Sequence, residues 1–328
     1  MQTEYPSKQP AKKTNSENRK NFGDILASLR KQHHDKYHKE WNTEKLSQAS
    51  AVDGKGSIPA QVIANIECGR RANIDSDTLL QLAAALSLTP LERKDFFFMA
   101  VGVGNEIGAA EYYSDKDSKD VFETLSGICA PAYIMDQYCD FVAFNSAVLN
   151  LFGADPAYMD SLRLQPAGLN MLRYIFTDKN FKDSVDPDHW KKVALNNVFF
   201  LRRITLKYRH TDYFQQLLDA LLEIDDFGKM WFDSFNPRIL QESRQNIALT
   251  DNNYSVYKLS GQSFIGTDTP VMTSQGELHL VAYIPQCIET ADVFMQIVRS
   301  SERKIHFAAS WPEKEVYWPH VNPKNADK

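Results

Sequence analysis

The sequence lacks the features that mark secreted, membrane or zinc-binding proteins. Its four cysteines, Cys68, Cys129, Cys139 and Cys287, form no CxxC pair and no zinc spacing, which predicts reduced thiols in a cytoplasmic protein. No run of about 18 apolar residues occurs, and residues 1–20 are polar. We therefore expect neither membrane insertion nor export.

Common catalytic motifs are also missing. No G-x-S-x-G elbow, H-E-x-x-H helix, phosphate-binding Gly loop or paired-carboxylate motif accompanies Ser126, Asp188 or His189. His34 and His38 are spaced for one helix face, but no carboxylate or Cys completes a known ligand set, so a solvated helix end is expected. The sequence predicts no enzyme, no metal site and no required cofactor.

Composition is that of an ordinary soluble protein. The chain has 328 residues, 43% hydrophobic and 24% charged, which suits about two globular domains. Residues 1–105 carry a formal charge of +3 and the remainder −8. This asymmetry weakly favours a polyanionic partner for the N-terminal part only.

Residues 22–99 have the apolar spacing of five short helices. The predicted inward-facing residues are Phe22, Ile25, Leu26 and Leu29, then Leu46, Ala49 and Val52, then Val62, Ile63 and Ile66, then Leu79, Leu82, Ala83 and Leu86, and finally Phe96–Met99. Such short helices can bury these faces only against one another. The segment therefore predicts an all-α five-helix domain.

Local signals place the ends of these helices. Asn42, Ser57 and Asp75 can each cap a helix by accepting a backbone N–H. Two glycines within Asp53–Gly56 favour a turn, and Gly69 is expected to end the helix that precedes it. The order of helix, turn and helix is the outline of a helix-turn-helix DNA-binding domain.

The sequence resembles the xenobiotic-response-element (XRE) family of helix-turn-helix domains in three segments, Leu46-Ser47, Val62–Arg71 and Asp77–Thr89. In that family the helix equivalent to Pro59–Glu67 lies in the DNA major groove. The resemblance implies base-facing positions at Ala60, Gln61, Ala64 and Asn65, and phosphate contacts at Thr43, Arg70 and Arg71. Gln and Asn suit the first role because each can pair bidentately with adenine. Double-stranded DNA is thus the expected partner, with homodimer formation left open.

The alternative for this segment is a helical domain without DNA. Leu and Ile stripes occur in any five-helix domain, and an Arg pair usually marks a solvated face, so the ordered family pattern carries the DNA-binding prediction. Glu67 is expected to be a structural partner for a nearby Arg or a helix end rather than a base contact.

Residues 103–119, a Gly-containing and charged stretch, are predicted to be the linker. After it the sequence has patterns of both strands and helices. Expected elements are strands at Pro131–Asp136 and Asp140–Asn145, a helix at Ser146–Phe152, the segment Leu169–Asp178, helices at Trp190–Tyr208 and Thr211–Glu223, and strands at Ser255–Leu259, Glu277–Pro285 and Val293–Ile297. This order predicts an α+β domain with an antiparallel sheet.

Several of these segments resemble the ligand-binding domain of MmyB-like transcription regulators, which has a PAS-like fold and follows an XRE-type domain. The segments are Pro131–Asp136, Phe144-Asn145, Leu151–Gly153, Asn170–Asp178 and Leu278–Tyr283. The resemblance implies an apolar cavity that accepts a fatty acid or similar lipid, held by about 0.8 kcal/mol per buried CH₂.

Candidate lining residues of this ligand pocket are Tyr133, Phe141, Phe144, Leu149, Phe152, Leu172, Arg173, Tyr174, Ile175 and Phe176, with Arg173 or Tyr133 as the carboxylate partner. The competing interpretation is that these aromatic side chains only fill a core.

The predicted architecture is multi-domain. It comprises a disordered arm at 1–20, a helix-turn-helix domain at 21–102, the linker at 103–119, a PAS-like domain at 120–300 and a C-terminal tail at 301–328. The predicted function is a sequence-specific DNA-binding transcriptional regulator that senses a small apolar ligand. The alternative is a PAS-like domain that serves only for dimerisation or partner docking.

Overall fold

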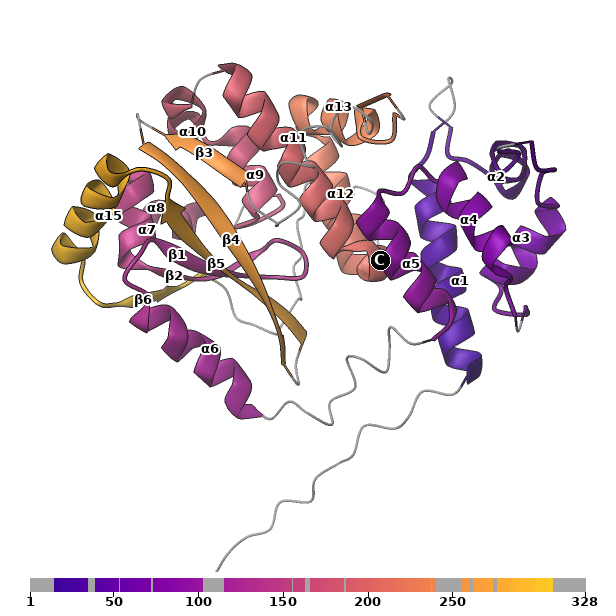
Figure 1. Ribbon diagram of the computed structural model, residues 1–328, viewed down its shortest axis with the longest axis horizontal. Coiled ribbons are helices and arrows are strands. Elements are labelled where there is room, and N and C mark those ends of the chain that lie inside the picture. The colour runs from indigo at the N-terminus through magenta and orange to yellow at the C-terminus, as the bar shows by residue number, and fades with distance from the viewer. Residues whose placement is uncertain are drawn as a thin grey trace, which may run out of the picture. The chain divides into compact units, whose positions relative to one another are not determined.

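The computed structural model describes residues 15–34, 39–52, 54–71, 73–102, 115–154, 156–162, 166–185, 187–236, 238–239, 255–259, 262–273 and 276–308. The chain divides into two compact units, residues 1–114 and 115–328. The first is helical and the second combines helices with a sheet (Figure 1). Within the described residues, no helix is long and apolar enough to cross a membrane.

The helical unit follows the predicted pattern. Its described helices are α1 (Asn15–Lys31), α2 (Thr43–Ala49), α3 (Ala60–Glu67), α4 (Ser76–Ala85) and α5 (Pro90–Ala100). Most predicted inward-facing residues are buried, namely Phe22, Ile25, Leu26, Leu29, Leu46, Ile63, Ile66, Leu79, Leu82, Ala83, Leu86, Phe96 and Met99. Burial of these stripes against one another forms the core of the unit, as the sequence predicts.

Capping explains most of the helix boundaries. The side chains of Asn42 and Asp75 accept backbone N–H groups of α2 and α4 at 2.9 and 2.7 Å, which confirms both predicted caps. Gly69 follows α3 with φ +67°, a conformation that favours glycine. The prediction for Ser57 is wrong, because Pro59 is the N-cap residue of α3 and makes no side-chain cap.

The second unit is built on an antiparallel sheet. Its described strands are β1 (Ala132–Asp136), β2 (Phe141–Asn145), β3 (Ser255–Leu259), β4 (Gln262–Thr273), β5 (Gly276–Pro285) and β6 (Ile305–Phe307). They lie in the order β3-β4-β5-β1-β2-β6, and each pair is antiparallel. The two central strands β5 and β1 therefore pair with each other, although the paired residues are 142 to 150 positions apart in sequence.

Helices cover both faces of this sheet (Figure 1). They are α6 (Asp115–Gly127), α7 (Ser146–Phe152), α8 (Pro156–Leu162), α9 (Met171–Thr177), α10 (Lys179–Ser184), α11 (Pro187–Ile204), the short 3₁₀ helix η2 (Leu206–Tyr208), α12 (Asp212–Leu222), α13 (Asp225–Asp233) and α15 (Ile288–Ser300). Because strand side chains alternate, Val281 and Tyr283 of β5 join the larger core beneath α7–α13, whereas Leu278 packs with Val121 and Leu125 of α6.

The described elements confirm the predicted fold class, a multi-helix domain followed by an α+β domain with an antiparallel sheet. One predicted strand is wrong, because Val293–Ile297 lies within the helix α15. Its buried residues Thr290 and Phe294 are four apart, which is helical rather than strand spacing. The strand β4, which pairs along the whole of β5, was not predicted.

Element ends also differ from the expected boundaries. The helix α1 begins at Asn15, inside the predicted arm 1–20, and α6 begins at Asp115, inside the predicted linker 103–119. Ile305–Phe307, inside the predicted tail 301–328, pairs with β2 as β6. The remaining parts of those three segments, 1–14, 103–114 and 309–328, lie outside the described residues.

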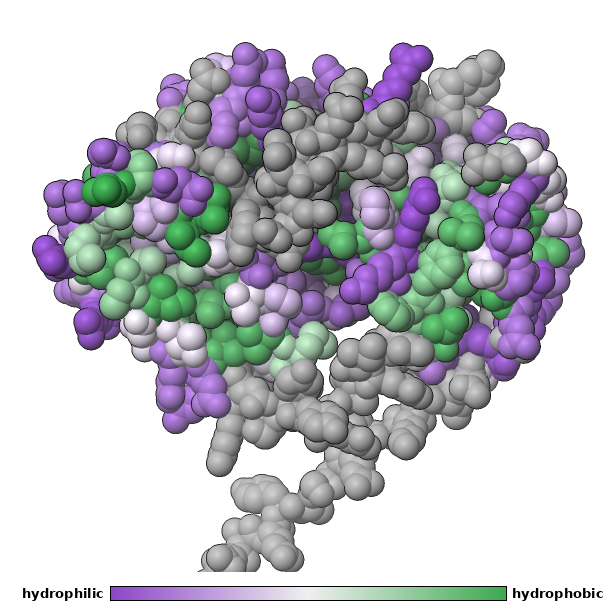
Figure 2. Space-filling model, viewed as in Figure 1, coloured by the Kyte–Doolittle hydropathy of each residue, from purple (hydrophilic) through white to green (hydrophobic). Residues whose placement is uncertain are grey.

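Some hydrophobic side chains of the second unit remain on its surface. Ile284 of β5 is 45% exposed, and Ile288 and Met295 of α15 are 77% and 50% exposed. Figure 2 shows hydrophobic residues at the surface in the region where α15 and the sheet lie. An exposed apolar surface of this kind can mark a contact surface.

Candidate functional site

The first candidate site is the outward side of α3. Ile63 and Ile66 face the core, and the predicted base-facing residues lie on the other side of the helix, where Gln61 is exposed and Ala60, Ala64 and Asn65 are partly exposed. The amide of Gln61 donates to Asn65 Oδ1 at 3.3 Å. The two amide side chains thus lie together on one side of α3, one helical turn apart.

The predicted phosphate contacts lie at neighbouring helix ends. Thr43 is the first residue of α2 and is partly exposed, and Arg70 is exposed after α3. Arg71 is more constrained, because its Nε donates to Asn73 O at 3.2 Å and its guanidinium lies 3.7 Å from Asp75 Oδ2. Arg70 is therefore the more accessible cation of the pair.

Glu67, at the end of α3, is a structural residue. Arg30 of α1 donates to both of its carboxylate oxygens, at 2.7 and 2.9 Å. Both side chains are only 11% exposed, and Arg30 also donates to Trp41 O at 2.5 Å. This bidentate pair fixes the end of α3 against α1 and confirms the role predicted for Glu67.

The second candidate site is an apolar cavity between the sheet and the helices α7–α10. Its lining residues are Tyr133, Phe141, Phe144, Val148, Leu149, Phe152, Ala154, Met159, Met171, Tyr174, Ile175, Phe181 and Tyr283. None of these described residues carries a charged side chain. The free volume is about 40 Å³, against roughly 10–15 Å³ for one water on such a measure. A long apolar chain would enter only if lining side chains moved.

Seven of the ten predicted pocket residues line this cavity, namely Tyr133, Phe141, Phe144, Leu149, Phe152, Tyr174 and Ile175. Leu172, Arg173 and Phe176 do not. The reason is helical phase, because Met171, Tyr174 and Ile175 are three and four apart and occupy the cavity side of α9.

The other face of α9 packs away from the cavity. The ring of Phe176 lies 5.6 Å from that of Trp190 and 5.4 Å from that of Phe227. Arg173 donates to Gly168 O at 3.2 Å, and burial lowers the pKa of its guanidinium. Arg173 is therefore not a carboxylate partner inside the cavity as the structure stands.

Sequence reasoning missed six lining residues, Val148, Ala154, Met159, Met171, Phe181 and Tyr283. Two of them had a signal. Tyr283 closes the quoted strand Leu278–Tyr283, and Met171 lies three residues before Tyr174 in the quoted helix segment. For Met159 and Phe181, on α8 and α10, no pattern in the sequence indicated a common cavity.

Part of the described cavity lining is accessible from the surface. Among the described lining residues, ten are buried, and Phe152, Ala154 and Tyr174 are partly exposed. The rings of Phe152 and Tyr174 lie 6.1 Å apart, and each lies within 6.1 Å of the Phe181 ring. We call Phe152, Ala154 and Tyr174 the cavity mouth.

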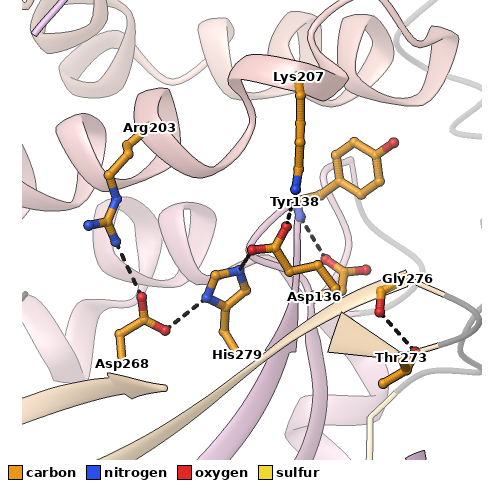
Figure 3. Close-up of polar contacts among 9 residues, drawn as sticks. Asp136, Tyr138, Arg203, Lys207, Asp268, Thr273, Gly276 and His279 are labelled. Atoms are coloured by element: carbon orange, nitrogen blue, oxygen red, sulfur yellow. Dashed lines mark hydrogen bonds and ion pairs between the residues drawn. The ribbon is translucent and has the colours of Figure 1, made fainter. Parts of the chain in front are cut away.

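A buried polar network lies elsewhere on the same face of the sheet (Figure 3). Arg203 donates to Asp268 at 3.2 Å, and His279 Nδ1 lies 2.8 Å from the other Asp268 oxygen. On the far side of the imidazole, Nε2 lies 3.5 Å from Glu277, whose second oxygen lies 2.6 Å from Lys207 Nζ. The network joins α11 and η2 to β4 and β5, and sequence reasoning did not find it.

The comparisons with known proteins bear on the second unit. Residues 121–237 match the family described as MmyB-like transcription regulator ligand binding domain. The match includes the last part of α6, the helices α7–α13 and every described cavity-lining residue except Tyr283. It supports a transcription regulator of that family with a ligand-binding domain. No curated protein matches the chain.

Proposed function

We propose that this protein is a sequence-specific DNA-binding transcriptional regulator of the XRE type, and that its PAS-like domain binds a fatty acid or similar apolar molecule. The observation that carries the proposal is the order of the two units. A unit whose described elements are the helices α1–α5 precedes a unit whose cavity-bearing part matches a regulator ligand-binding domain. The corresponding domain limits are 21–102 and 120–300, in a cytoplasmic protein with no catalytic activity.

DNA recognition rests on α3. Gln61 and Asn65 present two amides to solvent from adjacent turns, and each can pair bidentately with adenine in the major groove. Ala60 and Ala64, beside them, leave room for close approach and can contact a thymine methyl group. These four residues are the proposed base contacts.

Phosphate contacts would set the position of α3 on the duplex. Thr43 at the start of α2 lies near the N-terminal N–H groups of that helix, which attract an anion. Arg70 and Arg71 follow α3 and supply sequence-independent charge. The net charge of +3 on residues 1–105 acts in the same direction.

Two groups of variants test the DNA proposal. Gln61→Ala and Asn65→Ala should each lower affinity for the selected site by about 5- to 150-fold, with little change on random DNA, since one good bidentate pair is worth about 1–3 kcal/mol of discrimination. Arg70→Ala should weaken both DNAs alike and reduce the slope of log K against log salt by about 0.9. Gln296→Ala, an exposed glutamine of α15, is the matched control and should change neither.

Fluorescence anisotropy over a salt series measures both quantities, on a site obtained by selection from a random DNA pool. Equal losses on selected and random DNA from Gln61→Ala would contradict the assignment of α3. A chain that selects no DNA at all would contradict the proposed function.

Ligand sensing rests on the apolar cavity. Thirteen described residues without a charged side chain surround it, an environment that favours apolar chains by water release and dispersion. A ligand can change DNA affinity only by its preference for one arrangement of the chain over another, and the effect is reciprocal. DNA selection with and without added lipid therefore measures regulation separately from binding.

The second candidate function is a dimerisation or docking module with a filled core. Two observations favour it, the small free volume of the cavity and the exposed Ile284, Ile288 and Met295. Native mass spectrometry of the purified full chain distinguishes the two functions. Acyl chains that co-purify support sensing, whereas their repeated absence with a concentration-dependent dimer supports docking.

A further inference from the structure

Two tyrosine hydroxyl groups, those of Tyr174 and Tyr158, differ in what they contact. Tyr174 belongs to the mouth and its ring lines the cavity. Its hydroxyl makes no hydrogen bond to any residue that the structure describes. Nearby, the hydroxyl of Tyr158 donates to Asp178 at 2.7 Å. Tyr174 is thus a partly exposed donor whose hydrogen-bonding capacity is unused within the described chain.

Tyr133 and Arg173, the two residues expected from the sequence to meet a ligand head group, have partners elsewhere. The hydroxyl of Tyr133 lies 3.6 Å from Met171 Sδ in the buried part of the lining. Arg173 turns to Gly168 O on another side of α9. Among the described residues, Tyr174 is therefore the lining residue that offers a donor where the cavity reaches the surface.

The surroundings of the Tyr174 hydroxyl keep it protonated. Burial, followed by the charge of Asp178 and the effect of Tyr158, raises the pKa of the Tyr174 hydroxyl. The hydroxyl therefore stays protonated throughout the physiological pH range and can donate a hydrogen bond but cannot carry a negative charge.

We propose that Tyr174 positions the ligand by donating a hydrogen bond to an oxygen atom at the end of an apolar chain, while the chain itself occupies the cavity. The ligand class is thus a single-chain amphiphile with an oxygen acceptor, either neutral as in an alcohol or anionic as in a carboxylate. This inference rests on the proposed ligand-binding function and adds the orientation, with the chain inside and the oxygen at the mouth.

The partly exposed residues of the lining indicate where a chain would enter the cavity. The free volume of about 40 Å³ is too small for an eight-carbon chain, so entry displaces lining side chains. Phe152 and Tyr174 are the partly exposed aromatic residues of the lining, and their rings lie edge to face at the mouth with centroids 6.1 Å apart. A chain that enters between them leaves its polar end beside the Tyr174 hydroxyl.

The test compares three ligands of equal chain length on the full chain. Octane has no acceptor, n-octanol has a neutral one and octanoate has a charged one. Headspace gas chromatography measures Kd for octane and n-octanol, and titration calorimetry measures Kd for octanoate. The variant is Tyr174→Phe, which removes only an oxygen atom that has no described partner and leaves the ring in place.

Tyr174→Phe should weaken n-octanol by about 2- to 12-fold, the net value of one neutral hydrogen bond, and octanoate by more than about 12-fold if the bonded head is charged. Octane should bind the variant as it binds the wild type. Tyr133→Phe is the matched control, because it makes the same change at another lining tyrosine and should not separate octane from the other two ligands.

Three outcomes decide the inference. Selective loss of the oxygen-bearing ligands supports it, and the relative losses of n-octanol and octanoate identify the head group. An equal loss for octane, or no loss for either oxygen-bearing ligand, overturns the role of Tyr174 while leaving ligand binding intact. A wild-type chain that binds none of the three overturns the proposed ligand function and this inference with it.

Discussion

Gly23, inside α1, allows α1 and α3 to approach closely. A Cβ atom built at Gly23 would lie 2.3 Å from Glu67 O and 2.7 Å from Ile66 O. Both oxygens belong to the backbone at the end of α3, which the Arg30–Glu67 pair also fixes. An alanine at this position therefore cannot be accommodated by turning a side chain, and the helices must separate.

Two opposing effects determine the outcome of Gly23→Ala. In a helix interior alanine is favoured over glycine by about 0.5–1 kcal/mol. Overpacking a close contact costs typically about 1–3 kcal/mol, and a 2.3 Å approach to backbone belongs in the upper half of that range. We expect a net destabilisation of the helical unit by about 1–2 kcal/mol.

Hydrogen exchange of the full chain, resolved by peptide, measures this effect without assuming that both units unfold together. Amides of α1 and α3 should exchange about 5- to 30-fold faster in Gly23→Ala. Gly127→Ala at the end of α6 is the control, because no atom of the residues that the structure describes lies within 4 Å of its Cβ position. It should leave exchange in α6 unchanged or slower. Unchanged or slower exchange in α1 and α3 of Gly23→Ala would refute the close-approach argument.

Two further predictions concern named carboxylates. Asp75 accepts the backbone N–H and hydroxyl of Thr78, which lower its pKa, so its charge-dependent stabilisation is present above the unfolded pKa and is lost as pH falls through the folded pKa. Asp75→Ala should cost about 1 kcal/mol at neutral pH, whereas Asp75→Asn should retain the cap and remove this acid dependence. Hydrogen exchange of the α4 amides at pH 7 and pH 3 checks both variants. An Asp75→Asn chain with the wild-type pH dependence would be inconsistent with this prediction. Asp268→Asn should cost about 3 kcal/mol, because it removes the carboxylate that pairs with the Arg203 guanidinium in a buried network. Exchange in β4 and β5 should rise in this variant, while the exposed Asp292→Asn shows no change. Equal protection in the two variants would count against the network.

Local chemistry made the helical unit predictable. Asn42 and Asp75 cap helices by contacts within three residues, and Gly69 takes a conformation that glycine favours. The same local logic failed at Ser57, because the start of α3 is held by the buried Ile58, whose N–H donates to Ser50 Oγ at 2.8 Å. A contact across eight residues decided that boundary.

The strands show where periodicity becomes ambiguous. β1 and β2 were predicted because short aromatic and β-branched runs flank a turn. Val293–Ile297 has a similar composition but forms part of α15, since short apolar runs do not distinguish a strand from a helix face. β4 was missed because its polar and Gly-containing sequence has little strand signal, and it is stabilised by pairing with β5.

Part of the candidate pocket could also be predicted from the sequence. The aromatic residues of β1, β2 and α9 lie in the segments that carry the family resemblance and could be grouped on that basis. Leu172 and Phe176 do not line the described cavity, since hydrophobicity alone does not say which side of α9 faces it. Met159, Phe181 and Tyr283 come from three elements that only the packed fold brings to one place.

The sequence by itself determined the order of a helical unit and an α+β unit, the caps and stripes of the helices, and the amide pair on α3, because these depend on contacts between near neighbours. The tertiary structure decided which residues enclose the cavity, where it reaches the surface, and that Arg203, Lys207, Asp268, Glu277 and His279 form one network. Those features join residues far apart in the chain, and their positions follow from strand register and helix packing rather than from any local pattern.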